Sequence, residues 1–305
     1  ISLVSLRAGR NSQVFRAQAA DACWIIKHYV TPPAGGRDRL AVEFGFLQFC
    51  NEHALNGVPQ AIAMDASRQL ALYSFLPGER PSLLSPQHIE QAVDFLLRLN
   101  ALRRYPDARQ LPAAADACLQ WQDHLNLLAR RLERLRQVAE PAATFVQQKL
   151  VPAWQALSRL LEQDSSRVVP VISPSDFGFH NCLQQGDKCA FVDFEYAGWD
   201  DPAKLACDFL CQPEMPVDKA LGELFLEGFC SGLGDDTLLA RVQRLLPLHR
   251  LKWCCILLNE FCAEDWQRRL HAGLVAENLL DIQFHKAVTY FERYVQPVLP
   301  ASRIT

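Results

Sequence analysis

One island of strand-like sequence, residues 168–194, interrupts a chain that otherwise reads as helical from about residue 79 onward. Two apolar pieces, VVPVI and CAFVDF, bracket the polar loop SPSDFGFHNCL and the turn QQGDK. Short apolar runs that are rich in β-branched and aromatic residues and bounded by turn residues are typical of buried strands. We therefore predict an α+β protein in which a strand hairpin is embedded among helices.

Residues 1–78 follow a different pattern. Alternating apolar and polar residues in ISLVSL, QVFRAQ, CWIIKHYV and QLALYSFL predict half-buried antiparallel strands. Between the third and fourth of these, Leu40, Phe44 and Leu47 fall on one face of a helix. We expect residues 1–78 to form a small antiparallel sheet with one helix packed on it.

The segment LPGERPSLLSP (residues 76–86) is a change in composition and a predicted hinge. Ser85 and Pro86 provide a helix cap and a first helical residue, and an amphipathic stripe follows. Further along, the basic run ARRLERLR is interpreted as the solvated face of another helix. Residues 79–305 are therefore predicted to be a second, larger and mostly helical lobe.

Composition excludes several classes of protein. A chain of 305 residues that is 50% hydrophobic can bury the core of two domains or of one bilobed unit. With 31 basic and 34 acidic residues, the chain lacks the charge expected of a protein that binds nucleic acid or anionic membranes. No apolar run approaches the ~20 residues needed to span a bilayer. Since the chain begins at Ile1 without a leader sequence, we expect no signal peptide, and the missing starting methionine points to absent upstream residues.

The eleven cysteines lie mostly in apolar runs and form no paired CxxC motif. This pattern favours reduced, buried thiols and a cytoplasmic location over a disulfide framework or a zinc site.

Three polar side chains of the island have a spacing that suggests catalysis. Asp176 is followed after five residues by Asn181 and after twelve more by Asp193, at the ends of the two predicted strands. Kinases space a catalytic aspartate, a metal-binding asparagine and a metal-binding aspartate in this way. Mg²⁺ prefers such hard oxygen ligands. The alternative is ordinary turn chemistry, for which short polar residues are also suited.

A kinase site also needs a lysine on an N-terminal strand and a glutamate on the helix that follows. Lys27 in WIIKHY and Glu43 in RLAVEFGFL occupy these positions. A turn over the phosphates should come earlier, and RAGRNSQVFR supplies Gly9, Asn11 and Ser12. Each element alone has a structural explanation, because strand lysines and helix glutamates usually face solvent. The order of all of them favours a catalytic site.

These motifs resemble the aminoglycoside phosphotransferase and choline kinase superfamily, small-molecule kinases with a protein-kinase-like two-lobed fold. SPSDFGFHN and VDFEYAGWDDPA stand where that superfamily has its catalytic and metal-binding loops. The resemblance implies ATP-dependent transfer of a phosphoryl group to a hydroxyl of a small metabolite, such as a sugar, an amino sugar or an amino alcohol. It further implies Asp176 as catalytic base, Asn181 and Asp193 as Mg²⁺ ligands, and Lys27, held by Glu43, on the phosphates.

The resemblance extends to LYSFLPGERP, where main-chain groups near Ser74 and Leu76 would meet the adenine. It is incomplete at Pro174 and Ser175, where the superfamily has histidine and glycine. This departure motivates an alternative, a nucleotide-binding pseudokinase or regulatory module without turnover. A helical scaffold that binds no nucleotide is the third possibility.

The acceptor site has the weakest sequence signal. Glu195, Asp200 and Asp201 could attract a cationic acceptor, although Asp201 precedes a proline and could cap a helix instead. In LKWCCILLNEFCAEDWQRRLHAG, read as one helix, Asn259 is predicted to point inward and Glu260 to align with Glu264. Glu195, Asp201, Asn259 and Glu260 are the acceptor candidates, and an exposed helix face is the alternative for the glutamates.

Overall fold

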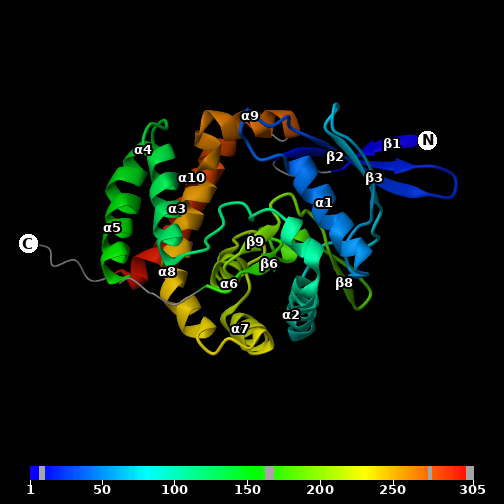
Figure 1. The fold of residues 1–305 in the computed structure, drawn as a ribbon. Helices are drawn as coiled ribbons and strands as arrows, with labels where there is room; N and C mark the ends of the chain where they lie inside the picture. Colours follow the sequence, from blue (N-terminus) through cyan, green and yellow to red (C-terminus); the bar gives the residue numbers. More distant parts are fainter. Residues whose placement is uncertain (7–10, 162–167, 274–276, 300–305) are drawn as a thin grey trace, which may run out of the picture.

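The computed structural model describes residues 1–6, 11–161, 168–273 and 277–299. Its N-terminal part is a five-stranded antiparallel sheet with the strand order β1-β2-β3-β5-β4 (Figure 1). The strands of the sheet are β1 (Ser2–Ser5), β2 (Ser12–Gln18), β3 (Cys23–Tyr29), β4 (Ala61–Asp65) and β5 (Leu70–Ser74). Helix α1 (Arg39–Glu52) lies between β3 and β4 in the chain and contacts β4 and β5. The predicted small sheet with one helix is confirmed.

Helix α1 begins at a defined cap and buries one face. The carboxylate of Asp38 accepts a hydrogen bond from the backbone N–H of Ala41 at 3.0 Å, which satisfies a donor of the first turn. Leu40, Phe46 and Leu47 are buried on the inner face. Glu43 lies on the same face and is therefore carried into the interior by its apolar neighbours.

The rest of the chain is mostly helical, as predicted. Its helices are α2 (Pro86–Ala101), α3 (Trp121–Arg134), α4 (Ala142–Phe145), α5 (Val151–Leu160), α6 (Pro202–Cys211), α7 (Lys219–Leu233), α8 (Leu238–Leu257), α9 (Ala263–Ala272) and α10 (Leu279–Tyr290). Helix α2 starts at Pro86 with Ser85 as its cap, where the sequence predicted it. All eleven cysteines are free. Within the described ranges, no helix has both the length and the apolar character that crossing a membrane requires.

The predicted strand island is present inside the helical part. β7 (Cys182–Gln185) and β8 (Lys188–Phe191) form the hairpin, and β6 (Val171–Ser173) pairs with β9 (Gly198–Asp200), a strand that the sequence did not predict. Gln184 of β7 exchanges two backbone hydrogen bonds with Glu79 in the segment between β5 and α2, at 2.7 and 3.1 Å. A Cβ atom on Gly78 would lie 2.7 Å from the carbonyl oxygen of Gln184, so glycine is needed for this close approach.

One prediction about the helices is wrong. The segment from residue 251 to 273 is not one helix, because α8 ends at Leu257 and a 3₁₀ turn, η5 (Asn259–Phe261), separates it from α9. The break rotates the two halves relative to each other, so Glu260 and Glu264 do not share a helical stripe.

Helix α9 contacts the N-terminal sheet. It lies beside β2 (Figure 1), where Gln13 donates a hydrogen bond to the carbonyl of His271 at 2.9 Å. The rings of His28 and His271 meet edge to face with centroids 5.1 Å apart. This contact joins the two parts of the chain away from the segment between β5 and α2.

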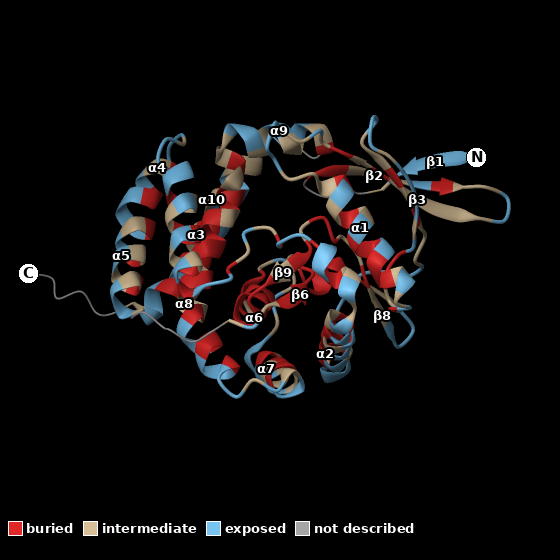
Figure 2. Ribbon diagram, in the orientation of Figure 1, coloured by how far each residue is buried: buried red, intermediate tan, exposed pale blue. Residues whose placement is uncertain are grey.

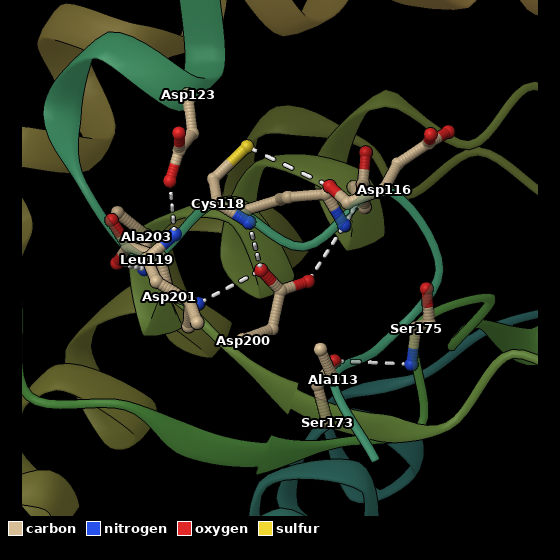
Figure 3. A network of polar contacts seen from close by, with 12 residues as sticks. Ala113, Asp116, Cys118, Leu119, Asp123, Ser173, Ser175, Asp200, Asp201 and Ala203 are labelled. Atoms are coloured by element: carbon tan, nitrogen blue, oxygen red, sulfur yellow. Dashed lines mark hydrogen bonds and ion pairs between the residues drawn. The ribbon is translucent and has the colours of Figure 1, made fainter. Parts of the chain in front are cut away.

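Buried residues gather on α6, β6, β9 and the inner side of α8 (Figure 2), and charged side chains lie among them. Asp200 and Asp201 are both 0% exposed. Asp200 accepts hydrogen bonds from the backbone N–H groups of Cys118 and Asp201 (Figure 3) and from Lys204 at 2.7 Å. Asp201 caps α6 through the N–H of Ala203 and also accepts from His124 and Arg241. These pairs offset the loss of hydration that burial imposes on each charge.

Replacing Arg241 by methionine is therefore expected to lower the free energy of unfolding by about 3–5 kcal/mol, because Asp201 would lose its buried cationic partner. The matched control is Arg98→Met, which breaks the exposed pair with Asp94 and should lower it by less than about 1 kcal/mol. Urea unfolding followed by circular dichroism measures both. Equal midpoints for the two variants would contradict a stabilising role for the buried pair.

Candidate active site

Lys27 and Glu43 meet inside the N-terminal part of the chain. Lys27, in the middle of β3, places its Nζ 2.7 and 3.0 Å from the two carboxylate oxygens of Glu43 on α1. Glu43 also accepts hydrogen bonds from the hydroxyl of Tyr29 at 2.7 Å and from the backbone N–H of Phe194 at 3.3 Å. The glutamate is thus fixed by both parts of the chain, and it in turn fixes the lysine.

The same ammonium group reaches across to the hairpin. Lys27 Nζ lies 2.9 Å from Asp193 Oδ1. Burial lowers the pKa of Lys27, but Asp193 and Glu43 outweigh it and hold the pKa well above its usual value. Lys27 therefore carries its positive charge at neutral pH and joins β3, α1 and the segment after β8.

Asp193 has an unusual backbone conformation. Its φ is 71°, in the left-handed region that non-glycine residues seldom adopt. Strain of this kind concentrates at functional sites, where the surrounding structure holds it in place. Its side chain is 30% exposed, so the carboxylate remains accessible to a ligand while it contacts Lys27.

Three carboxylates converge at this point. Glu43, Asp193 and Glu195 each place an oxygen within 4.8 Å of the others. Glu195 is buried, and its Oε2 has no hydrogen-bond partner among the described residues. Burial first, and then the charge of Asp193, raises the pKa of Glu195 to about 8. An enclosed carboxylate oxygen without a partner, beside further carboxylates, fits the oxygen donors that a divalent cation such as Mg²⁺ requires.

Asp176 and Asn181 lie on the loop between β6 and β7. Asn181 ends a 3₁₀ turn, η4 (Phe179–Asn181), and its Nδ2 donates to the carbonyl of Asp176 at 3.0 Å. Its own carbonyl accepts from the N–H of Val192 at 2.9 Å, which ties the loop to the segment that carries Asp193. The amide is thereby oriented, with Oδ1 as the atom that could take a cation.

Ser175 occupies the position at which the sequence departs from the superfamily glycine. Its φ is 68°, a conformation that suits glycine and costs other residues about 1–2 kcal/mol. Its N–H donates to the Oγ of Ser173 at 3.0 Å (Figure 3), so the loop keeps its shape with serine in place.

Ser175→Gly is expected to raise the free energy of unfolding by about 0.5–1 kcal/mol, because relief of the strain outweighs the extra freedom of glycine in the unfolded chain. Ser158→Gly in α5 is the control and should lower it by a similar amount, since glycine is unfavourable in a helix. Thermal denaturation distinguishes the two. A loss of stability in Ser175→Gly would show that the strain is smaller than its φ implies.

The residues predicted to cover the phosphates and the base divide into three groups. Gly9 lies outside the described residues. Asn11 is buried and donates to Glu195 Oε1 and to the hydroxyl of Tyr196, both at 2.6 Å, while Ser12 is buried at the start of β2. The N–H of Ser74 donates to the carbonyl of Gln60 at 3.0 Å, so that group is already paired, and Leu76 lies half-buried just beyond β5.

The predicted acceptor residues do not form one group. Glu195 lies beside Asp193, as described above. Asp201 is enclosed as the cap of α6 and is not exposed to solvent. Asn259 is half-buried in η5, and Glu260 is buried and bound by Arg269 at 2.7 and 2.9 Å. Attraction of a cationic acceptor by Asp200 and Asp201 therefore has no basis in the structure.

Several residues near the site were not predicted. Arg37, before α1, donates to the carbonyls of Glu195, Ala113 and Ala197 at 3.3, 2.9 and 2.9 Å, and so braces the segment after Asp193. His180 lies 3.3 Å from Asp176.

The basic run of α3, interpreted as solvated, is only partly so. Its Arg131 is half-buried and paired with Asp116, and its Arg134, although exposed, pairs with Asp265 of α9. Spacing along the chain gives no signal for the contact between Arg134 and Asp265, because these residues are 131 positions apart.

Comparison with known proteins decides the family. A model of the phosphotransferase enzyme family matches residues 2–245, most of the chain. The chain belongs to this family. No curated protein gives a significant match to this phosphotransferase.

Solved structures share its fold at low sequence identity. The gentamicin complex of APH(2")-IIa has a TM-score of 0.62 at 15% identity, covering 96% of this chain and 91% of that one. The amicoumacin kinase hAmiN, in complex with AMP-PNP, Ca²⁺ and Ami, has a TM-score of 0.63 at 14% identity, with coverage of 97% and 89%. A choline/ethanolamine kinase family protein from Mesorhizobium loti has a TM-score of 0.60 at 16% identity, with coverage of 96% and 88%.

The predictions of family and fold class are therefore confirmed. The protein is a small-molecule phosphotransferase with the two-lobed, protein-kinase-like α+β fold. The roles of individual residues remain predictions.

Proposed function

We propose that this phosphotransferase transfers the γ-phosphoryl group of ATP to a hydroxyl of a small metabolite in a Mg²⁺-dependent reaction. Residues 1–78 would form the nucleotide-binding lobe, and residues 79–305 the lobe that carries the catalytic loop and the acceptor pocket. The observation that carries the proposal is the ammonium group of Lys27, which contacts Glu43 and Asp193 at once. This contact supports the proposal because kinases use a strand lysine, held by a helix glutamate, to bind the phosphates.

Each group has a defined task in this proposal. Lys27 binds the negatively charged phosphates, and Glu43 keeps the lysine in position. Asn181 and Asp193, with the enclosed oxygen of Glu195, would hold Mg²⁺, which neutralises phosphate charge when bound. Asn11 and Ser12, with Gly9 before them, would cover the phosphates, and the backbone near Ser74 and Leu76 would meet the adenine.

Asp176 would orient the acceptor hydroxyl and take up its proton. Phosphoryl transfer depends mainly on positioning and charge stabilisation, so a well-placed carboxylate is sufficient for this task. The similar structures include a gentamicin complex, a complex of amicoumacin kinase with AMP-PNP, Ca²⁺ and Ami, and a choline/ethanolamine kinase family protein. A sugar, an amino sugar or an amino alcohol is accordingly the proposed acceptor class, and Asn259 and Glu260 are proposed as contacts of the acceptor.

Two measurements test the proposal together. A thermal-shift titration with Mg²⁺ and ATP reports nucleotide binding, and a screen for ADP release over sugars, amino alcohols and nucleosides reports turnover. A raised melting temperature together with acceptor-dependent ADP release is the expected result. An unchanged melting temperature would contradict the proposal and favour a scaffold without nucleotide binding.

Pro174 supports a second candidate, a nucleotide-binding pseudokinase or regulatory module, because it removes the histidine of the superfamily loop. Stabilisation by Mg²⁺ and ATP without ADP release on any acceptor would favour that candidate.

A further inference from the structure

Arg37 donates hydrogen bonds to three backbone carbonyls. The residue lies between β3 and α1, two positions before the helix begins at Arg39. Its Nη1 and Nη2 donate to the carbonyls of Ala113 and Ala197, both at 2.9 Å, and its Nε donates to the carbonyl of Glu195 at 3.3 Å. One side chain of the N-terminal part of the chain thus holds two separate segments of the helical part.

These two segments are also packed against each other. The N–H of Trp199 donates to the carbonyl of Pro112 at 2.9 Å. Gly198 has a φ of 155°, and a Cβ atom on it would lie 2.2 Å from the same carbonyl oxygen, so glycine is required for this approach. Arg37 therefore binds a junction of two segments that already touch, through the carbonyl of Ala113 on one of them.

The junction begins next to the strained backbone of Asp193. A conformation of this kind, with a φ of 71°, persists only when the surrounding structure holds it in place. Two of the contacts that follow it in the chain come from the N-terminal part. The N–H of Phe194 donates to Glu43 at 3.3 Å, and Arg37 holds the carbonyl of Glu195. The position of Asp193 thus depends on groups from both parts of the chain.

We infer that Arg37 is a positioning residue that fixes the segment after Asp193, and with it the carboxylates of Asp193 and Glu195, for the divalent cation. This inference rests on the proposed function, in which these carboxylates hold Mg²⁺. Groups that orient the ligands of a metal typically contribute about 10–100-fold to its affinity or to activity. A guanidinium carries five N–H donors in a fixed plane, which suits it to bind several carbonyls at once.

Amide hydrogen exchange measures this bracing without nucleotide or metal. Arg37→Met should raise the exchange rate of the amides of residues 194–199 by about tenfold, because contacts that restrain this segment are lost. The hairpin of β7 and β8 should keep its rate, since its ladder does not involve Arg37. Arg103→Met is the matched control. Arg103 also donates to two backbone carbonyls, those of Asn100 and Pro170 at 3.0 and 3.2 Å, and its loss should leave residues 194–199 unchanged.

The Mg²⁺ dependence of turnover shows whether the bracing serves the cation. ADP release, with water or an active member of the acceptor screen, is measured at several Mg²⁺ concentrations. Arg37→Met should raise the Mg²⁺ concentration for half-maximal rate by about tenfold and lower kcat by about 10–100-fold. A smaller folded fraction alone would lower the rate without changing the Mg²⁺ requirement. Arg37→Lys keeps the charge but not the planar arrangement of donors, so it should resemble Arg37→Met.

The outcomes separate this inference from the proposed function. Unchanged exchange in Arg37→Met, an equal rise along the whole chain, or an Arg37→Lys protein that behaves as the wild type would overturn the inference. If Arg37→Met turns over with the wild-type Mg²⁺ requirement, the inference is wrong and the proposed function stands. If the wild type releases no ADP, the proposed function fails, and the exchange rates still decide whether Arg37 braces the segment.

Discussion

Replacing Asp193 by alanine is expected to abolish Mg²⁺-dependent nucleotide turnover, with kcat/KM for ATP reduced by at least about 10³-fold. Charge stabilisation by a bound divalent cation contributes several kcal/mol to reactions of phosphates, and each 1.36 kcal/mol corresponds to a factor of ten in rate. Asp193 is the proposed cation ligand that also contacts Lys27, at 2.9 Å, so its loss removes a ligand and one of the two carboxylates that hold the ammonium group. Steady-state ADP release at several Mg²⁺ concentrations measures the effect.

The control for this change lies on the same hairpin. Asp187 is an exposed aspartate in the turn between β7 and β8, and Asp187→Ala should leave turnover within about twofold of the wild type. The Asp193→Ala protein should remain folded, because the change removes only a short and partly exposed side chain. Wild-type turnover of a folded Asp193→Ala protein would remove the metal assignment.

Asp176→Asn is expected to lower kcat by about 10²–10⁴-fold while KM for ATP changes little. General base catalysis contributes rate factors of this size, and asparagine has nearly the same shape but cannot take up a proton. Asp176 is assigned to the acceptor hydroxyl and not to the phosphates or the base, so we expect a selective effect on the chemical step. A proportionate fall in kcat and in ATP affinity would instead indicate a role in nucleotide binding.

Equilibrium binding distinguishes these cases. Mg²⁺ and AMP-PNP should raise the melting temperature of Asp176→Asn as much as that of the wild type, and should stabilise Asp193→Ala much less. Asp187→Asn serves as the matched isosteric control for the aspartate-to-asparagine change. If Asp176→Asn turned over at the rate of Asp187→Asn, the proposed base would have to be sought elsewhere.

The sequence predicted the parts of the fold that depend on local pattern. Alternation along the first strands, the cap at Ser85 and the apolar pieces around the central loop are signals that adjacent residues carry by themselves. The approach of Lys27 to Glu43 could also be expected, because a helix that follows a strand packs back on its own sheet.

What the sequence did not predict depends on contacts between distant segments. The pairing of Asn11 with Glu195 joins residues that are 184 positions apart, and the braces made by Arg37 reach a loop and a turn of the other lobe. The break between α8 and α9 was missed because LLNEFC contains neither glycine nor proline and continues the apolar pattern. The burial of Asp201 and its partners was also missed. A proline after an aspartate signals a helix cap, but it does not signal that the cap is buried.

The contact between α9 and β2 has a mechanical consequence. The hydrogen bond from Gln13 to His271 and the histidine pair beside it add to the attachments that Lys27 makes to Asp193 and Asn11 makes to Glu195. If the two parts separate to exchange the nucleotide of the proposed reaction, the contact between α9 and β2 must give way as well. We therefore expect a weaker contact at this place to speed that exchange.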